Sequence, residues 1–126
     1  MPNPPDEITL WRDDNGYAQA SIPQRHIHHS QTGYEFGYLG SGPADLALNI
    51  LALYLPLSHQ SDRHEAMKLW DNTEVSARAW SLHQQFKQDI VARIPQEAGG
   101  TITIQQVMFW LGQKLVPREE IGVSHE

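Results

Sequence analysis

Histidine is the side chain that this sequence offers most densely for chemistry. Three of its seven histidines, His26, His28 and His29, fall in the polar segment 24–33, which reads QRHIHHSQTG. If residues 26–28 are extended, His26 and His28 point to the same side of the chain, and two imidazoles so placed can share a metal ion. This spacing is less specific than a helical His-Glu-x-x-His pair. A solvated polar loop is therefore the favoured interpretation, and a metal site at these three histidines is the weaker one.

Three further polar residues could serve acid–base chemistry or ligand binding. Glu35 lies between two aromatic residues, and burial there would raise the pKa of its carboxyl group. Asp45 and Asn49 are four residues apart, so they share one face of a helix that is otherwise apolar. Buried polar groups need hydrogen-bond partners, and we therefore expect a structural role for this pair.

The turn Gly40-Ser41-Gly42-Pro43 precedes that helix, and glycines at a helix N-terminus can form an anion site. A phosphate loop requires Lys-Ser or Lys-Thr after the last glycine, whereas Pro-Ala follows here. A tight turn that needs small residues is the favoured interpretation, and a ligand or nucleotide pocket is the alternative. The candidate ligand-binding residues are Tyr34, Glu35, Tyr38, Ser41, Asp45 and Asn49.

Four tryptophans are many for a chain of this length. Trp80, Phe109 and Trp110 lie beside, rather than on, the apolar stripes of their predicted helices. Surplus aromatic residues of this kind can form a protein interface, so these three are the candidate interface residues. Burial on two sides of a small domain is an equally good interpretation.

The elements that position these residues begin with three predicted strands. Residues 8–11 and 17–22 are β-prone and flank Asn15-Gly16, which favours a tight hairpin turn. Residues 34–38 alternate aromatic and other side chains, which predicts a third strand.

Helices are predicted to follow the strands. The first covers 43–55, with Gly42 as its N-cap and Asp45 in its first turn. A short helix is expected over 62–70 and a longer one from Asn72 or Thr73 to about Arg93, followed by a loop over 96–100. Thr103 and Gln106 form a capping box for a last helix, whose predicted buried stripe is Ile104, Val107, Met108 and Leu111. The fold class is α+β, with a small antiparallel three-stranded sheet packed against three to four helices.

Length and composition exclude several classes of protein. With 126 residues the chain is one domain, with an ordered core expected over about 6–113 and flexible ends at 1–5 and 116–126. It has no cysteine, and its net charge of −6 without a basic run argues against direct nucleic-acid binding. We expect a cytoplasmic protein without a signal peptide, membrane span or cofactor.

The stretch from His29 to Leu48 resembles domain of unknown function 6166, a family of short proteins from bacteria, plasmids and phages. The family motif is similar to N-H-S-P-x-G-[FY]-E-W-G-Y-x-G-S-G-P-A-x-L-A-L. In this chain His28, Gln31 and Phe36 stand where the family has Asn, Pro and Trp. Later segments also resemble the family, so that the likeness covers about residues 8–112.

The resemblance implies a mobile-element setting and no particular activity. Small acidic proteins in that setting bind host proteins, including defence and CRISPR components, or mimic the charge of DNA. Acidic residues are spread over both halves of this chain, which disfavours DNA mimicry. The leading hypothesis is therefore a non-enzymatic protein that binds a host protein. The alternatives are a small-molecule or nucleotide pocket at the Gly40–Pro43 turn and a metal hydrolase that uses His26, His28 and His29.

Overall fold

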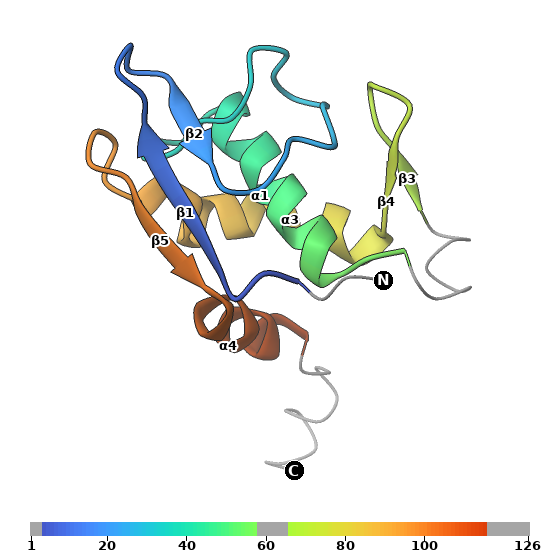
Figure 1. Ribbon diagram of the computed structural model, residues 1–126. Helices are drawn as coiled ribbons and strands as arrows, with labels where there is room; N and C mark the ends of the chain where they lie inside the picture. Colours follow the sequence, from blue (N-terminus) through green and yellow to red (C-terminus); the bar gives the residue numbers. More distant parts are fainter. Residues whose placement is uncertain (1–3, 58–65, 116–126) are drawn as a thin grey trace.

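A computed structural model describes residues 4–57 and 66–115 of the chain. Strands β1 (Glu7–Arg12), β2 (Ala18–Ala20) and β5 (Gly100–Thr103) form an antiparallel sheet in the order β2-β1-β5. Helix α1 (Ser41–Tyr54) is the central helix and packs against α3 (Ala77–Asp89) (Figure 1). A short 3-10 helix, η1 (Val91–Arg93), follows α3, and α4 (Ile104–Leu115) follows β5. The α+β class is confirmed.

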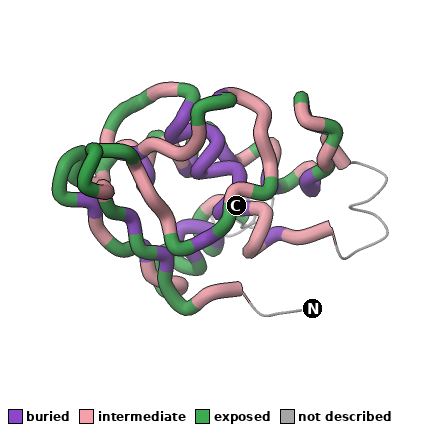
Figure 2. Tube along the Cα trace, turned by 45° about the horizontal axis from the view of Figure 1, so that its top comes forward, coloured by how far each residue is buried: buried purple, intermediate pink, exposed green. Residues whose placement is uncertain are grey.

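The hydrophobic core surrounds α1. Every residue from Gly42 to Leu51 is buried, and Figure 2 shows this stretch as the buried centre of the tube. The sheet contributes Ile8, Leu10 and Ile102, which alternate with exposed or half-buried neighbours as a one-sided sheet requires. None of the described helices is long and apolar enough to cross a membrane.

Local sequence signals placed the first hairpin and the last helix correctly. Gly16 has a φ of 85°, as the turn between β1 and β2 requires, and the Asp13 carboxylate accepts backbone N–H bonds from Asn15 and Tyr17. At the start of α4, the Gln106 N–H donates to Thr103 Oγ1 at 3.1 Å. The Thr103 N–H donates to Gln106 Oε1 at 2.8 Å. The predicted capping box is therefore present.

The third strand of the sheet was predicted in the wrong place. Residues 34–38 belong to no helix or strand, and Gly37 has a φ of 88°, which breaks the alternation of a strand. The sheet is completed instead by Gly100–Thr103, where we had predicted a loop ending at Gly100 and a helix cap at Thr103. Thr103 serves both elements, because it pairs with Glu7 and also caps α4.

The short helix predicted over 62–70 is wrong in its described part. Met67–Lys68 is strand β3, which pairs with β4 (Glu74–Val75) in a second hairpin. Asn72 adopts a φ of 72° in the turn, and Asp71 Oδ1 accepts the Thr73 N–H there. The turn formed by Asp71, Asn72 and Thr73 favours a hairpin over the predicted helix. Residues 58–65, including His59 and His64, lie outside the described part, as do residues 1–3 of the predicted end 1–5 and the whole of the predicted end 116–126.

Helix limits also differ from the prediction. Gly40, not Gly42, is the N-cap of α1, and the first turn contains no acidic residue because Asp45 lies further along the helix. Ser76 caps α3 by accepting the Ala79 N–H, so this helix begins after the predicted Asn72 or Thr73. On α4 the buried stripe contains Trp110 in place of Met108, which is exposed.

Candidate functional site

The polar segment 24–33, called here the histidine loop, is attached to α1 by Asp45. The Asp45 carboxylate is fully buried and accepts backbone N–H bonds from three consecutive loop residues. His29 and Ser30 donate at 2.9 and 3.0 Å, and His28 donates at 3.1 and 3.3 Å to the two carboxylate oxygens. Three converging donors satisfy a charge that the apolar surroundings of α1 would otherwise penalise strongly. The role of Asp45 is therefore structural.

Asn49 extends this attachment by one helical turn. Its Oδ1 accepts the backbone N–H groups of Arg25 and His26, both at 2.9 Å. Its Nδ2 donates to the carbonyl oxygens of His26 and Asp45. Every hydrogen-bonding position of the Asn49 amide is thus occupied by the chain itself. The i, i+4 spacing predicted that the two residues share a face, and the histidine loop is the partner of that face.

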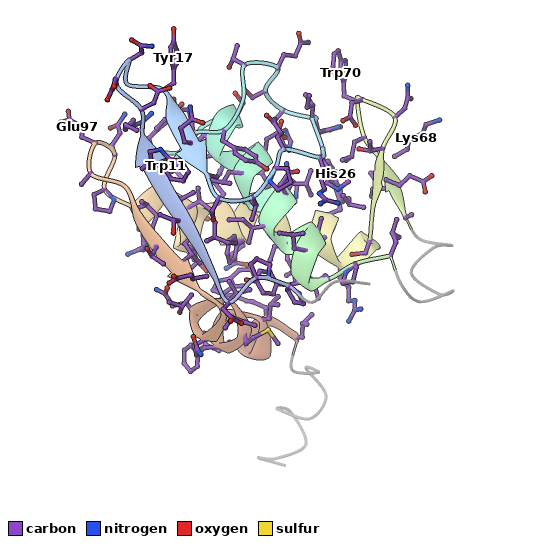
Figure 3. All side chains as sticks on the ribbon, viewed as in Figure 1. Trp11, Tyr17, His26, Lys68, Trp70 and Glu97 are labelled. Carbon is purple, nitrogen blue, oxygen red and sulfur yellow. The ribbon has the colours of Figure 1, made fainter. Side chains whose placement is uncertain are left out.

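The other side of the histidine loop contacts the β3–β4 hairpin. His26 Nδ1 lies 2.8 Å from Thr73 Oγ1, and Figure 3 shows the His26 ring directed toward this hairpin. His28 Nδ1 accepts the Trp70 N–H at 2.9 Å. The backbone of Ile27 exchanges hydrogen bonds with Asp71 in both directions. The loop is therefore a bonded layer between α1 and the hairpin and not a solvated loop.

His29 lies against α3, where its Nε2 is 2.9 Å from Nε2 of His83. His83 is 2% exposed, and its Nδ1 lies 2.6 Å from the Trp80 carbonyl oxygen, which can only accept. Nδ1 of His83 therefore carries a proton, and in neutral His83 the Nε2 atom is the acceptor for His29. The Trp80 ring packs against His28, His29 and His83, with centroid distances of 5.0, 6.1 and 4.8 Å.

The geometry of the imidazole pair favours a hydrogen bond over a shared metal. The two ring centroids are 5.1 Å apart. This distance is close to the sum of the Nε2–Nε2 separation and the two ring radii, so the two nitrogens lie almost on the line that joins the centroids. A metal ion between two in-line imidazole nitrogens would hold them about 4 Å apart, so the 2.9 Å separation leaves no room for one. Among residues 4–57 and 66–115, no group of three or more metal-ligating side chains is present.

The His29–His83 pair predicts a loss of stability in mild acid. Burial lowers the pKa of His29, and it lowers the pKa of His83 from 6.5 to about 4. The negative charge of Asp45 opposes both shifts, whereas His28 adds to both. Lys87 adds to the shift of His29. The unfolded chain therefore binds more protons between pH 6.5 and 4. The contribution of His83 is fully present above pH 6.5 and falls by about 3 kcal/mol as the pH drops through this window.

Urea unfolding at pH 7, 6 and 5 measures this slope. His83→Gln should flatten it, whereas His28→Gln, which leaves the His29–His83 hydrogen bond in place and removes only a minor cause of both shifts, should retain most of it. A His83→Gln variant with the slope of the wild type would contradict the assignment.

Glu35 is anchored on a different side of α1. Arg12 Nη1 lies 2.8 Å from Oε1 and 3.1 Å from Oε2 of Glu35, and the Arg12 guanidinium also lies 4.5 Å from the centroid of the buried Phe36 ring. This pairing fixes the segment before α1 against β1. Glu35 is therefore an ion-paired residue that holds the chain in place.

The glycines around this segment allow close approach of the chain. A Cβ on Gly42 would lie 2.7 Å from Cβ of Glu35, and one on Gly37 would lie 2.6 Å from Cα of Gln96. At Gly40 it would meet the Tyr38 ring at 2.6 Å. These distances explain the Gly40-Ser41-Gly42 sequence by packing alone.

The six candidate ligand residues do not converge on one pocket. Tyr34 and Glu35 line a groove of about 470 Å³ beside β2, and Glu35 and Tyr38 line a second, open cleft of about 640 Å³ with Arg12. Asp45 and Asn49 are buried and bonded to the histidine loop, and Ser41 is exposed. The predicted pocket at the helix N-terminus is therefore divided between separate places.

A family model, described as a family of unknown function (DUF6166), matches residues 7–71. The chain belongs to this family. No curated protein and no solved structure matches it. The matched region includes β1, β2, the histidine loop, α1 and β3, and it ends at Asp71, before the α3 and α4 segments that the sequence resemblance included.

The interface candidates of this DUF6166 member have three different environments. Trp110 is buried against Phe86, and its Nε1 donates to Asp89 Oδ2 at 2.8 Å. Trp80 is half-buried as the platform for the histidine rings. Phe109 is 70% exposed. Of the three, Phe109 is therefore the residue with a free aromatic surface.

Sequence reasoning for this family member missed the role of His83. The position of His83 could have indicated that it is buried, because it lies four residues after Ala79 and three before Phe86, both of which are buried on α3. A histidine on the core side of a helix needs a polar partner. The partner, His29, is 54 residues distant in the chain, so no local pattern could have identified it.

Proposed function

We propose that this DUF6166 member is a non-enzymatic protein-binding domain whose binding surface is the outer face of α4. The observation that carries the proposal is the exposure of neighbouring apolar side chains on this helix. Phe109 is 70% exposed, Met108 is 54% exposed and Leu115 is 39% exposed. A surface helix normally presents polar residues to water, so this face has the composition of the centre of an interface.

The surroundings of this face agree with an apolar protein partner. Gly112 lies between Met108 and Phe109 on the helix surface, and a Cβ placed there would meet nothing within 4 Å. The other exposed side chains of α4 are glutamines, and the helix contains no acidic residue although the whole chain has a net charge of −6. An uncharged patch of this kind fits a partner that offers an apolar pocket to the Phe109 ring.

The most specific version of the proposal names the partner as a host protein. In a phage- or plasmid-encoded protein acting in the host cytoplasm, the partner would be a host protein, and binding would inhibit a defence component such as a CRISPR effector. The resemblance of the central motif to proteins of mobile elements supports this form. The lack of a dense acidic stripe in the sequence favours a protein contact over DNA mimicry.

The test is a pull-down from host lysate with the tagged wild-type protein and two helix variants. Phe109→Glu should reduce the retained partner by about 30-fold, because an aromatic residue at the centre of an interface contributes about 2 kcal/mol or more. Gln85→Glu is the matched control, since it adds the same charge to an exposed helical position outside α4. Equal retention by all three proteins, or none by the wild type, would refute the proposal, provided that thermal unfolding shows all three to be folded.

A small-molecule or nucleotide site is the second candidate function. It is favoured by the open cleft of about 640 Å³ lined by Arg12, Glu35, Tyr38, Gln96 and other residues near the start of α1. Arg12 could bind an anionic group there, although its guanidinium is already paired with Glu35. A thermal-shift screen with nucleotides distinguishes this candidate, because a ligand of the folded state raises the unfolding temperature.

A further inference from the structure

Strand β2 is an edge of the three-stranded sheet, and its outer side is open. The order β2-β1-β5 leaves Ala18–Ala20 paired on one side only. The Ser21 N–H donates to the Thr9 carbonyl oxygen and the Asp13 N–H to that of Tyr17, both at 2.9 Å. Hydrogen-bonded and non-bonded pairs alternate in an antiparallel ladder, so Gln19 faces β1 with its N–H and C=O groups.

The backbone groups of Ala18 and Ala20 therefore point away from β1. Within the described part of the chain, the backbone N–H and C=O groups of Ala18 and Ala20 have no hydrogen-bond partner. Edge strands usually prevent pairing with a further strand by carrying charged residues or proline, and β2 contains neither. Two N–H donors and two C=O acceptors, at the spacing of a strand, are thus free for a partner.

A groove of about 470 Å³ lies along this open edge. One wall is β2 with Tyr17 and Ile22, and the other is the segment 32–35 with Gln24. Residues 32–35 belong to no helix or strand, so the second wall makes no ladder with β2. The Tyr34 hydroxyl donates to the Pro23 carbonyl oxygen at 2.8 Å, which ties this wall to the chain just after β2.

The wall also holds a polar group without a partner. The side-chain nitrogen of Gln24 is buried and has no acceptor among the described residues. Buried donors are nearly always satisfied, so a small opening of this wall that let a peptide carbonyl reach the Gln24 nitrogen would be stabilised by a hydrogen bond.

We propose that this groove binds an extended peptide segment of another protein, which adds to the sheet as a strand beside β2. The free backbone groups of Ala18 and Ala20 would supply the ladder, as in other β-strand additions. A second copy of the chain fits poorly, because segment 32–35 forms the other wall of the groove and would meet the same segment of the second copy. A single extended segment can enter between the two walls.

The side chains around the groove define the class of peptide. The side chains of Ala18, Ala20 and Tyr34 pack against the core, so peptide residues that point inward beside them are small and apolar. The hairpin turn at one end of the groove carries Asp13 and Asp14. A lysine or arginine at the corresponding end of the peptide is therefore expected.

The experiment uses a displayed library of random eight-residue peptides, selected on the wild-type protein and titrated on two variants. Ala18→Pro removes an outward N–H that β1 does not use, at the first position of an edge strand, where proline is tolerated. Ala18→Ser retains the N–H. Selected peptides should bind Ala18→Pro at least about tenfold more weakly than wild type and Ala18→Ser with unchanged affinity.

A second measurement protects the test against misfolding of the proline variant. N-methylation of alternate residues in a selected peptide should abolish binding to the wild type in one register and leave it unchanged in the other. Enrichment of no peptide, equal binding to both variants, or insensitivity to N-methylation would overturn the proposal. So would sedimentation of the wild type as a dimer that Ala18→Pro dissociates. Peptide binding at the groove is independent of the proposed α4 surface, because Phe109→Glu leaves the groove intact.

Discussion

Asp45→Ala is expected to lower the free energy of unfolding by about 3–5 kcal/mol, among the largest losses available from a single side chain in this protein. The carboxylate is the common acceptor for the N–H groups of His28, His29 and Ser30. Without it, three backbone donors of the histidine loop lose their acceptor beside the apolar surface of α1. The loop must then detach toward water or remain with unsatisfied donors, and both outcomes destabilise the folded state.

Urea unfolding followed by tryptophan fluorescence measures this loss, since the chain contains four tryptophans. Asp45→Asn preserves the side-chain volume and one acceptor oxygen, so an intermediate loss is expected. Asp14→Ala removes an exposed carboxylate of the hairpin turn and should change stability by no more than about 0.5 kcal/mol. If Asp45→Ala behaved like Asp14→Ala, the attachment of the loop by this carboxylate would be disproved.

Gly99→Ala should have the second large effect, a loss of about 3–5 kcal/mol or a failure to fold. Gly99 has a φ of 73°, and a Cβ there would lie 2.1 Å from the Leu10 carbonyl oxygen and 3.0 Å from Cα of Trp11. These obstacles are backbone atoms of β1, which is held between β2 and β5. The central strand cannot move aside without breaking pairing on one side.

Gly16→Ala separates backbone strain from this close approach. Gly16 has a similar φ of 85°, but nothing lies within 4 Å of a Cβ placed on it. The left-handed conformation alone costs an alanine about 1–2 kcal/mol, so Gly16→Ala should remain folded with that smaller loss. Soluble yield and thermal unfolding of the two variants provide the comparison. Equal losses at both positions would show that the contact with β1 is not decisive.

The candidate site shows where prediction from the sequence stops. The i, i+4 spacing of Asp45 and Asn49 correctly indicated a shared, structural face, because helix periodicity is a local property. It could not indicate that the histidine loop occupies that face. Nor could the spacing of His26, His28 and His29 show that two of these rings contact a hairpin and the third contacts α3.

The sequence by itself determined the elements whose signals are local. Asn15-Gly16 specified the first hairpin, and Thr103 with Gln106 specified the start of α4, because a turn or cap depends on backbone energies within a few residues. The apolar run after Pro43 specified a central helix, because a helix that is hydrophobic on all sides must be buried on all sides.

Only the tertiary structure decided the long-range pairings. Gly100–Thr103 is a strand because β1 offers it an edge, and the more strand-like segment 34–38 is not, because Gly37 turns the chain away to pack beside Gln96. Trp110 is buried and Met108 exposed because tertiary packing decides which of the apolar residues of α4 meet the core, and the helix buries the side that carries Val107, Trp110 and Leu111. The physical reason is the same in each case: such choices depend on which surfaces meet, and contacts between residues distant in the chain leave no local pattern.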